Sequence, residues 1–306
     1  MTYEEKLAQF NEHIEAGGKV EAGDWMPDDY RRGVLKFIEM HANSEIMGAL
    51  PERECLPSAP TLQRKMSLCA KIQDEVGHAQ LLYRVAEDLG KSRVAMYEDL
   101  VNGKAKFHNV FHYPVKHWGD VAIIGWLIDG AALVTQAALL DSSYAPYTRV
   151  LKRICAEEQL HLRHGEDITL ELASGTDAQR EMFQEALDRW WLAIIHFFGP
   201  RSNVAKDLLL RWKVKTRTNE DLRNEFHDRY VPKILELGFT IPTPTPIQTD
   251  DGHWVLVEEE IDWAPLDAIK RNEGPETARR LATRQSMYDS HRWVREALEE
   301  PAIHAA

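Results

Sequence analysis

Cysteine is scarce in this chain: there are three in 306 residues, and their spacing suggests no pairing. An odd, scattered set excludes a disulfide framework and favours a reducing cytoplasm. The chain also lacks a four-cysteine cluster motif and a glycine-rich dinucleotide fingerprint, so any reductase function must lie on another polypeptide. The three cysteines are Cys55, Cys69 and Cys155.

Excess positive charge and an apolar N-terminal segment are absent as well. The formal net charge is −12, which argues against a nucleic-acid partner. The first residues, MTYEEKLAQF, are acidic and have no apolar core, so we expect no signal peptide. A hydrophobic content of 44% and a charged content of 28% are typical of a soluble globular protein with one or two domains.

One long apolar run stands out, VAIIGWLIDGAALVTQAALL at residues 121–140. Because it is apolar on every helical face, it predicts a helix buried all round. Its single charged residue is Asp129, and an unpaired carboxylate there would cost several kcal/mol. We therefore expect Asp129 to be hydrogen-bonded to a neighbouring helix, ion-paired or metal-bound. A membrane span is the other alternative, but Thr135, Gln136 and the lack of a second such segment argue against a membrane location.

Apolar periodicity predicts helices along most of the chain. Pro51 and Gly90 are expected to end two of them, and the Pro/Thr-rich stretch after Gly238 reads as an irregular tail with a short strand-like run. The expected helices lie within residues 1–24, at about 28–50, 61–89, 121–140, 147–173 and 177–198, once or twice within 204–238, and at about 275–298.

Two Glu-x-x-His motifs, Glu75–His78 and Glu158–His161, lie within predicted helices. Residues three apart share one helical face, so each pair can bind one metal ion. A single match arises by chance about once in a chain of this composition, and is weak evidence. The phasing is stronger, because Glu45 precedes Glu75 by 30 residues and Asp129 precedes Glu158 by 29. The same pair of helices, a carboxylate and then Glu-x-x-His, thus occurs twice.

This ligand set is that of a ferritin-like di-iron bundle, with Asp129 in place of one Glu. Four carboxylates balance two ferrous ions, and oxygen-rich ligands suit iron or manganese. The alternative is that hydrogen bonds alone satisfy these buried groups. We expect Asp74 and Glu157 either to orient the opposing histidines or to be ordinary exposed acids. His41, His164 and His196 are expected in the core or beside the ligands rather than among them. The fold class is therefore predicted to be all-α, a ferritin-like four-helix bundle with additional helices.

Several stretches resemble the catalytic component of ring-1,2-phenylacetyl-CoA epoxidase, a bacterial multicomponent di-iron oxygenase of phenylacetate catabolism. The resemblance covers about residues 24–265, and the six-residue ligand set makes it specific. It implies metal ligands at Glu45, Glu75, His78, Asp129, Glu158 and His161. The stretches are DWMPDDYRRGVLKFIEMHANSEIMGALPE, APTLQRK, KIQDEVGHA, IIGWLIDGAALV, SYAPYTR, ICAEEQLH, FFGP and RWKVKTRTNEDLR.

The resemblance implies an activity: two iron ions use O2 to add one oxygen atom across the aromatic ring of phenylacetyl-CoA. Electrons would come from NADPH through a separate flavin/iron–sulfur reductase. Two further partners are implied, namely a structural ferritin-like subunit without working metal, and a small bridging subunit. We expect an N-terminal arm at 1–24, a catalytic domain at 25–238, and an extension at 239–306 that wraps the bundle or contacts partners. The residues implied along the CoA channel are Lys36, Lys106, Phe107, His108, Asn109, His196, Lys215 and Asn219.

Other functions remain open at this point. A ferritin-type iron store would share the bundle but would need no basic channel for CoA. A ribonucleotide-reductase radical subunit would need a tyrosine where Leu82 stands, since Tyr83 lies off the required face. A non-catalytic protein of this fold would have lost ligands. A benzoyl-CoA epoxidase differs only in substrate, and one methylene in a pocket is worth about 1–3 kcal/mol.

Overall fold

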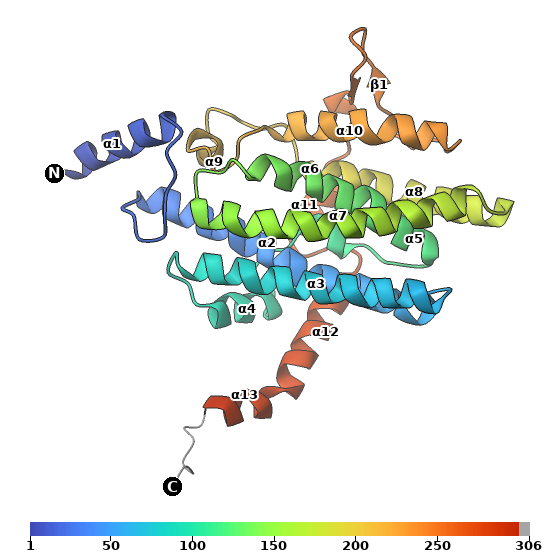
Figure 1. Cartoon of the computed structure of the whole chain (residues 1–306), viewed down its shortest axis with the longest axis horizontal. Helices are drawn as coiled ribbons and strands as arrows, with labels where there is room; N and C mark the ends of the chain where they lie inside the picture. Colours follow the sequence, from blue (N-terminus) through green and yellow to red (C-terminus); the bar gives the residue numbers. More distant parts are fainter. Residues whose placement is uncertain (300–306) are drawn as a thin grey trace.

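The structure, a computed structural model, describes residues 1–299 and is helical over most of them (Figure 1). The only strands in this range are two-residue strands that pair antiparallel, so the predicted all-α class is confirmed. The elements are α1 (Tyr3–Glu15), α2 (Asp28–Cys55), η1 (Leu56–Ser58), α3 (Leu62–Glu87), α4 (Arg93–Val101), η2 (Asn109–His112), α5 (Trp118–Ile123), η3 (Ile124–Ile128), α6 (Asp129–Leu139), α7 (Ala145–Ala173), α8 (Asp177–Phe198), α9 (Leu208–Arg211), α10 (Asn219–Glu236), β1 (Ile247–Gln248), β2 (Trp254–Val255), η4 (Glu258–Glu260), α11 (Ala264–Lys270), α12 (Thr277–Ser290) and α13 (Arg292–Glu299).

Four long helical segments form the ferritin-like bundle: α2, α3, α7 and the continuous stretch α5–η3–α6. Helix α2 packs along α3, α7 packs along η3 and α6, and α3 also contacts α7. Figure 1 shows the α2–α3 pair below the α6–α7 pair, with α10 above and α12 and α13 below. Side-chain caps begin several of the helices. Thr61 accepts a hydrogen bond from the main-chain N–H of Arg64, and Thr176 forms a capping box with Gln179.

Helix α2 does not end at Pro51 as predicted. It continues to Cys55, with Pro51 inside the helix. A proline in a helix interior removes one main-chain hydrogen bond and costs about 3 kcal/mol. Leu50, Pro51, Glu52 and Cys55 are all buried. Their packing against the neighbouring segments α3 and η1 outweighs that cost, and the sequence pattern alone did not reveal this tertiary contribution.

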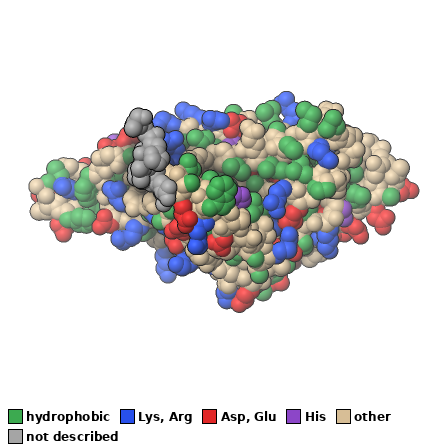
Figure 2. All heavy atoms as spheres, turned by 90° about the horizontal axis from the view of Figure 1, so that it is seen from below, with side chains coloured by type: hydrophobic (Ala, Val, Ile, Leu, Met, Phe, Trp, Pro, Cys, Tyr) green, Lys and Arg blue, Asp and Glu red, His purple; other side chains and the backbone are tan. Residues whose placement is uncertain are grey.

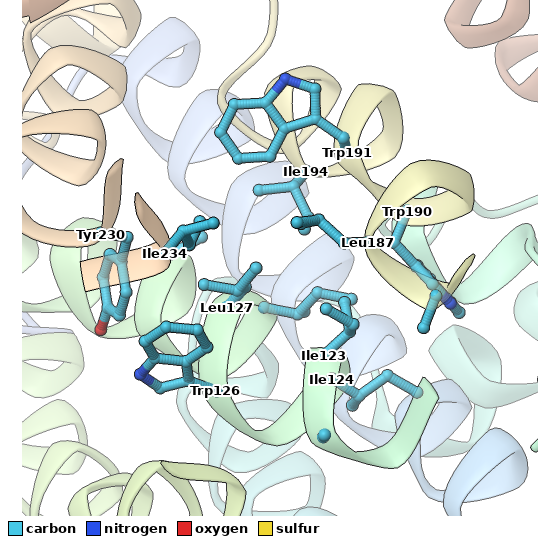
Figure 3. Packing of buried hydrophobic residues seen from close by; sticks show 14 of the residues in the cluster. Ile123, Ile124, Trp126, Leu127, Leu187, Trp190, Trp191, Ile194, Tyr230 and Ile234 are labelled. Carbon is cyan, nitrogen blue, oxygen red and sulfur yellow. The ribbon is translucent and has the colours of Figure 1, made fainter. Parts of the chain in front are cut away.

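The apolar run forms the centre of the molecule. The continuous helix Trp118–Leu139 is long and apolar enough to cross a membrane, yet 78% of its most apolar window is buried inside the protein. Figure 3 shows Ile123 and Leu127 facing Leu187 and Ile194 of α8, with Trp126 beside Tyr230 of α10. The run is therefore a core helix of the bundle, as predicted.

A π-helical segment, η3, lies directly before Asp129. Here the helix crosses α7 so closely that a Cβ atom added at Gly165 would lie 2.0 Å from the carbonyl carbon of Gly125. Only glycine on both helices allows this approach. A π-turn also shifts the register of the residues that follow it, and such turns are frequent at functional sites. The crossing and the π-turn together set the position of Asp129 against α7.

The tail after Gly238 is more ordered than predicted. It contains the short helix α11, which we did not expect, and the single helix expected at 275–298 is divided into α12 and α13. Leu266 and Ile269 of α11 are buried, which is why this short segment is helical despite a weak sequence pattern. On the face that carries α12, acidic and basic side chains are intermixed rather than gathered by sign (Figure 2). The part of the tail at 300–306 lies outside the described residues.

We predict that Gly165→Ala lowers the free energy of unfolding by about 3 kcal/mol or more, because backbone atoms of Gly125 cannot move aside for a methyl group. Denaturant unfolding measures this change. The matched control is Gly77→Ala on α3, where nothing lies within 4 Å of the added Cβ. That variant should be neutral or more stable by about 0.5–1 kcal/mol. Equal stability of the two variants would contradict the importance of the crossing.

Candidate metal centre

The six predicted ligands converge in the middle of the bundle. Glu45 comes from α2, Glu75 and His78 from α3, Asp129 from α6, and Glu158 and His161 from α7. None of the six is more than 6% exposed. They form two overlapping groups, within each of which the possible ligand atoms lie within 4.8 Å of one another. The groups are Glu45, Glu75, His78 and Glu158, and Asp129, Glu158 and His161.

Both histidines direct one ring nitrogen at the acids. Nδ1 of His78 lies 3.3 Å from carboxylate oxygens of Glu45 and Glu158. Nδ1 of His161 lies 3.3 Å from Glu158 and 3.7 Å from Glu75. Glu158 therefore lies between the two imidazoles, whose ring centroids are 6.0 Å apart. This arrangement is suited to a carboxylate shared by two metal ions.

The other ring nitrogens contact acids on the opposite helix. Nε2 of His78 lies 2.9 Å from Glu157 of α7, and Nε2 of His161 lies 3.1 Å from Asp74 of α3. Of the two alternatives left open for Asp74 and Glu157, the structure supports the one in which each acid orients the opposing histidine. Since an acceptor at Nε2 keeps the proton on that nitrogen, Nδ1 is left free to bind a metal ion.

The acids cannot all be ionised without added positive charge. Burial and the nearby Glu158 raise the pKa of Glu75 well above its ordinary value. Burial alone would also raise the pKa of Glu158, but hydrogen bonds from His161 and His78 hold it at about 2. In turn, despite its burial, His78 has its pKa raised to about 10 by Glu158 and Glu45. The cluster thus holds protons that divalent ions can replace, and its oxygen-rich donor set with two imidazoles fits iron or manganese.

A buried lysine, which was not predicted from the sequence, also contacts the cluster. The ammonium of Lys71 lies 2.5 Å from Asp129 and 2.6 Å from Glu52, and all three side chains are buried. Asp129 and Glu52 raise the pKa of Lys71 well above its ordinary value despite its burial. Asp129 therefore has an ion-pair partner on a neighbouring helix as well as a place beside Glu158. Lys71 lies four residues before Glu75, on the same helical face, which was a signal in the sequence.

Of the three histidines not expected to be ligands, His41 lies beside one. Its Nε2 is 2.8 Å from Glu45, and its Nδ1 is 2.7 Å from the hydroxyl of Tyr147. His196 is buried and contacts the main-chain oxygen of Asp262. Burial lowers the pKa of His164 to about 4, so its ring is neutral.

A cavity of about 300 Å³ extends from the acid cluster toward the loop between α9 and α10. Glu45, Glu75, Asp129 and Glu158 line one part of it, and Lys215 and other polar side chains of that loop line another. The wall also contains aromatic and aliphatic side chains. They include Phe37, Phe111, Ile124, Ile128, Tyr147, Phe197 and Phe198.

The eight residues implied for the CoA channel fall into three groups. His108, Lys215 and Asn219 line the cavity, and Lys215 donates hydrogen bonds to Asp207 and Asn219. The side chains of Lys36 and Lys106 are exposed and do not line this cavity. The remaining three are buried and do not line the cavity, and a substrate role for all eight stays a prediction. These three are Phe107, Asn109 and His196.

We predict that Glu157→Gln and Asp74→Asn each lower the affinity of the cluster for ferrous ion by about tenfold, because the facing imidazole loses a charged hydrogen-bond partner. Titration of the metal-free protein measures the affinity. Asp167→Asn is the matched control, since Asp167 is an exposed acid of α7. Unchanged affinity in both test variants would contradict this role.

We also predict that the metal affinity falls between about pH 8 and about pH 6. His78, with its pKa raised to about 10, and Glu75, with its pKa raised by burial, hold protons in the metal-free protein. These protons must leave when a metal ion binds, so a lower pH favours the metal-free form. Calorimetry in buffers of different ionisation enthalpy counts the protons released. An affinity independent of pH would contradict this assignment.

Comparisons with known proteins agree with this geometry. A model of the family described as phenylacetic acid catabolic protein matches residues 3–293. Over 300 residues the chain is 41% identical to the A component of the 1,2-phenylacetyl-CoA epoxidase of Escherichia coli (strain K12), which is named as a subunit of that enzyme. That match covers 97% of this chain and 96% of the relative. The resemblance inferred from the sequence is confirmed, and the chain belongs to the family of phenylacetic acid catabolic proteins.

Proposed function

We propose that this protein is the catalytic subunit of a phenylacetyl-CoA 1,2-epoxidase, an O2- and NADPH-dependent di-iron monooxygenase. The single observation that carries the proposal is the cluster of four buried carboxylates and two imidazoles in the wall of a largely apolar cavity. The name of the relative, part of an epoxidase that acts on phenylacetyl-CoA, supplies the substrate and the reaction.

The metal ligands in this proposal are Glu45, Glu75, His78, Asp129, Glu158 and His161, which also places the four acids in the catalytic machinery. The donor atoms of both groups are close enough together to hold two ions without large movements. The two irons, when bound, supply the redox chemistry that activates O2. Because the sequence contains neither a glycine-rich dinucleotide fingerprint nor a four-cysteine cluster motif, the electrons from NADPH would arrive from a separate reductase.

The chain's own side chains orient the substrate and exclude water. Phe111, Ile124 and Ile128 line the cavity together with the acids and would hold the aryl ring beside them. Lys215 and Arg217, in the loop before α10, would meet the phosphates of CoA. Because the basic side chains that meet the phosphates are gathered in one loop, a chain of net charge −12 can accept a polyanionic substrate. A closed iron store would have no need of such a basic loop.

The relative is named as one subunit of its enzyme, which supports a multi-subunit complex for this chain. We propose three partners in the cytoplasm: the reductase, a small bridging subunit, and a ferritin-like subunit with a structural role. The N-terminal arm at 1–24 and the extension at 239–306 are the proposed additions to a catalytic domain at 25–238. A related aryl-CoA oxygenase of the benzoyl type is the alternative, and direct comparison of the two thioesters distinguishes them.

We predict that Glu75→Ala and Asp129→Ala each reduce epoxidation of phenylacetyl-CoA more than about 100-fold, since each removes a metal ligand. Product formation by the assembled complex with its reductase measures the loss, and iron analysis should fall in parallel from about two ions per wild-type chain. Gln73→Ala, on the exposed face of α3, is the control and should remain active. Full activity of either ligand variant would refute the assignment.

A further inference from the structure

Phe111 occupies a particular place in the cavity wall. Its ring lies against the backbone of α2 at Gly48, where an added Cβ atom would be 3.0 Å from the Cε1 and Cζ atoms of Phe111. The same added atom would lie 3.5 Å from a carboxylate oxygen of Glu75. The ring of Phe111 therefore borders the acid cluster, and its position sets the space beside Glu75.

Phe111 belongs to η2, a single 3₁₀ turn in the long irregular connection between α4 and α5. The C-terminal tail holds this turn in place. His112 Nδ1 lies 2.6 Å from the hydroxyl of Thr277, and the main-chain N–H of Glu276 donates to the carbonyl oxygen of His112 at 2.9 Å. Both Thr277 and Glu276 lie at the start of α12. The wall beside the acid cluster is thus fastened by residues some 165 positions away in the sequence.

Arg280 makes the central contact of this fastening. Its side chain is fully buried, and its guanidinium donates to the main-chain oxygens of Phe111 and Tyr113, on either side of His112. Among the described residues no carboxylate pairs with it, in contrast to the neighbouring Arg279, which pairs with Glu54 and Glu276. A buried guanidinium without an acid is costly unless its donors are used. Here Nη1 and Nη2 donate to the two main-chain oxygens, and Nε has no partner among the described residues.

We propose that Arg280 is a positioning residue for the aryl ring of the substrate. By donating hydrogen bonds to the backbone on both sides of His112, it holds the Phe111 ring against Gly48 and fixes the shape of the cavity beside Glu75. Helix α12 of the C-terminal tail would thereby set the specificity of a site whose metal ligands all lie before residue 162. This inference rests on the proposed function, because that function assigns the aryl ring to this part of the cavity.

The proposal separates two parts of substrate binding. The residues assigned to the CoA phosphates, Lys215 and Arg217, lie in the loop before α10. They make no hydrogen bond or ion pair with the described residues of α12. Greater mobility of the Phe111 segment should therefore weaken the contribution of the substrate's aryl ring to affinity and leave the contribution of CoA unchanged. A purely structural role for Arg280 would affect both contributions together.

The test uses the chain assembled with its partner subunits and compares the affinities for phenylacetyl-CoA and acetyl-CoA. We expect the preference for phenylacetyl-CoA over acetyl-CoA to be about tenfold smaller in Arg280→Lys than in the wild type. A tenfold change is at the low end of the effect of an altered apolar contact in a pocket. The affinity for acetyl-CoA should stay the same. Arg279→Lys, the same substitution one residue earlier on α12, is the matched control and should keep the full preference.

A double-mutant cycle with Phe111→Leu tests whether Arg280 acts through the ring of Phe111. In that background Arg280→Lys should have little further effect on the preference, because the contact it supports has already been changed. Additive losses would overturn the proposal, and so would equal losses of affinity for both ligands. In turnover, KM for phenylacetyl-CoA should rise, and less product should form per NADPH consumed.

If Arg280→Lys does not fold, Thr277→Val provides the second variant, since it keeps the arginine and removes only the hydroxyl that contacts His112. A reduced preference for phenylacetyl-CoA supports the proposal, and an unchanged preference overturns it. A wild type that does not distinguish phenylacetyl-CoA from acetyl-CoA would contradict the proposed function itself. If the wild type prefers phenylacetyl-CoA and Arg280→Lys keeps the same preference, only the role of Arg280 is contradicted.

Discussion

The four carboxylates among the predicted metal ligands, all buried in one apolar bundle, are the constraint on which the rest of the structure depends. Each would be unstable alone in this environment, and none is on a loop that could turn toward solvent. The chain compensates with cations on the same helices: two imidazoles, and the ammonium of Lys71 between Asp129 and Glu52. The duplicated helix pair is the simplest way to bring these opposite charges to one level of the bundle.

The packing around the cluster keeps these charged side chains in fixed positions along the bundle. The glycine crossing between η3 and α7 lets two backbones meet where a side chain would hold them apart, just before Asp129. Glu157 and Asp74 cross between α3 and α7 in opposite directions and tie each imidazole to the facing helix. The apolar core that contains Trp126 and Ile194 lies where the continuous helix α5–η3–α6 packs against α8 (Figure 3). Rigidity and charge compensation therefore come from the same elements.

The parts of this design that depend on local spacing could be predicted. The phase of the two Glu-x-x-His motifs and the burial of the 121–140 helix follow from helical periodicity. Periodicity also offered the histidine contacts of Asp74 and Glu157, but only as one of two alternatives. What could not be predicted depends on contacts between distant segments. Pro51 stays inside α2 because packing outweighs a lost hydrogen bond. Arg280 reads as a surface residue until α12 is seen against η2, since no local pattern links positions 111 and 280.

Lys71 has a consequence for how such a protein matures. Because an ammonium and two imidazoles offset much of the charge of the buried acids, and the raised pKa of Glu75 keeps a proton on that acid, the bundle can fold before any ion arrives. In this it differs from small zinc domains, in which the ion itself drives folding. Under the proposed function, synthesis and metal insertion can then be separate events, and a newly made chain can wait for metal ions as a folded scaffold rather than as an unfolded polymer exposed to proteolysis.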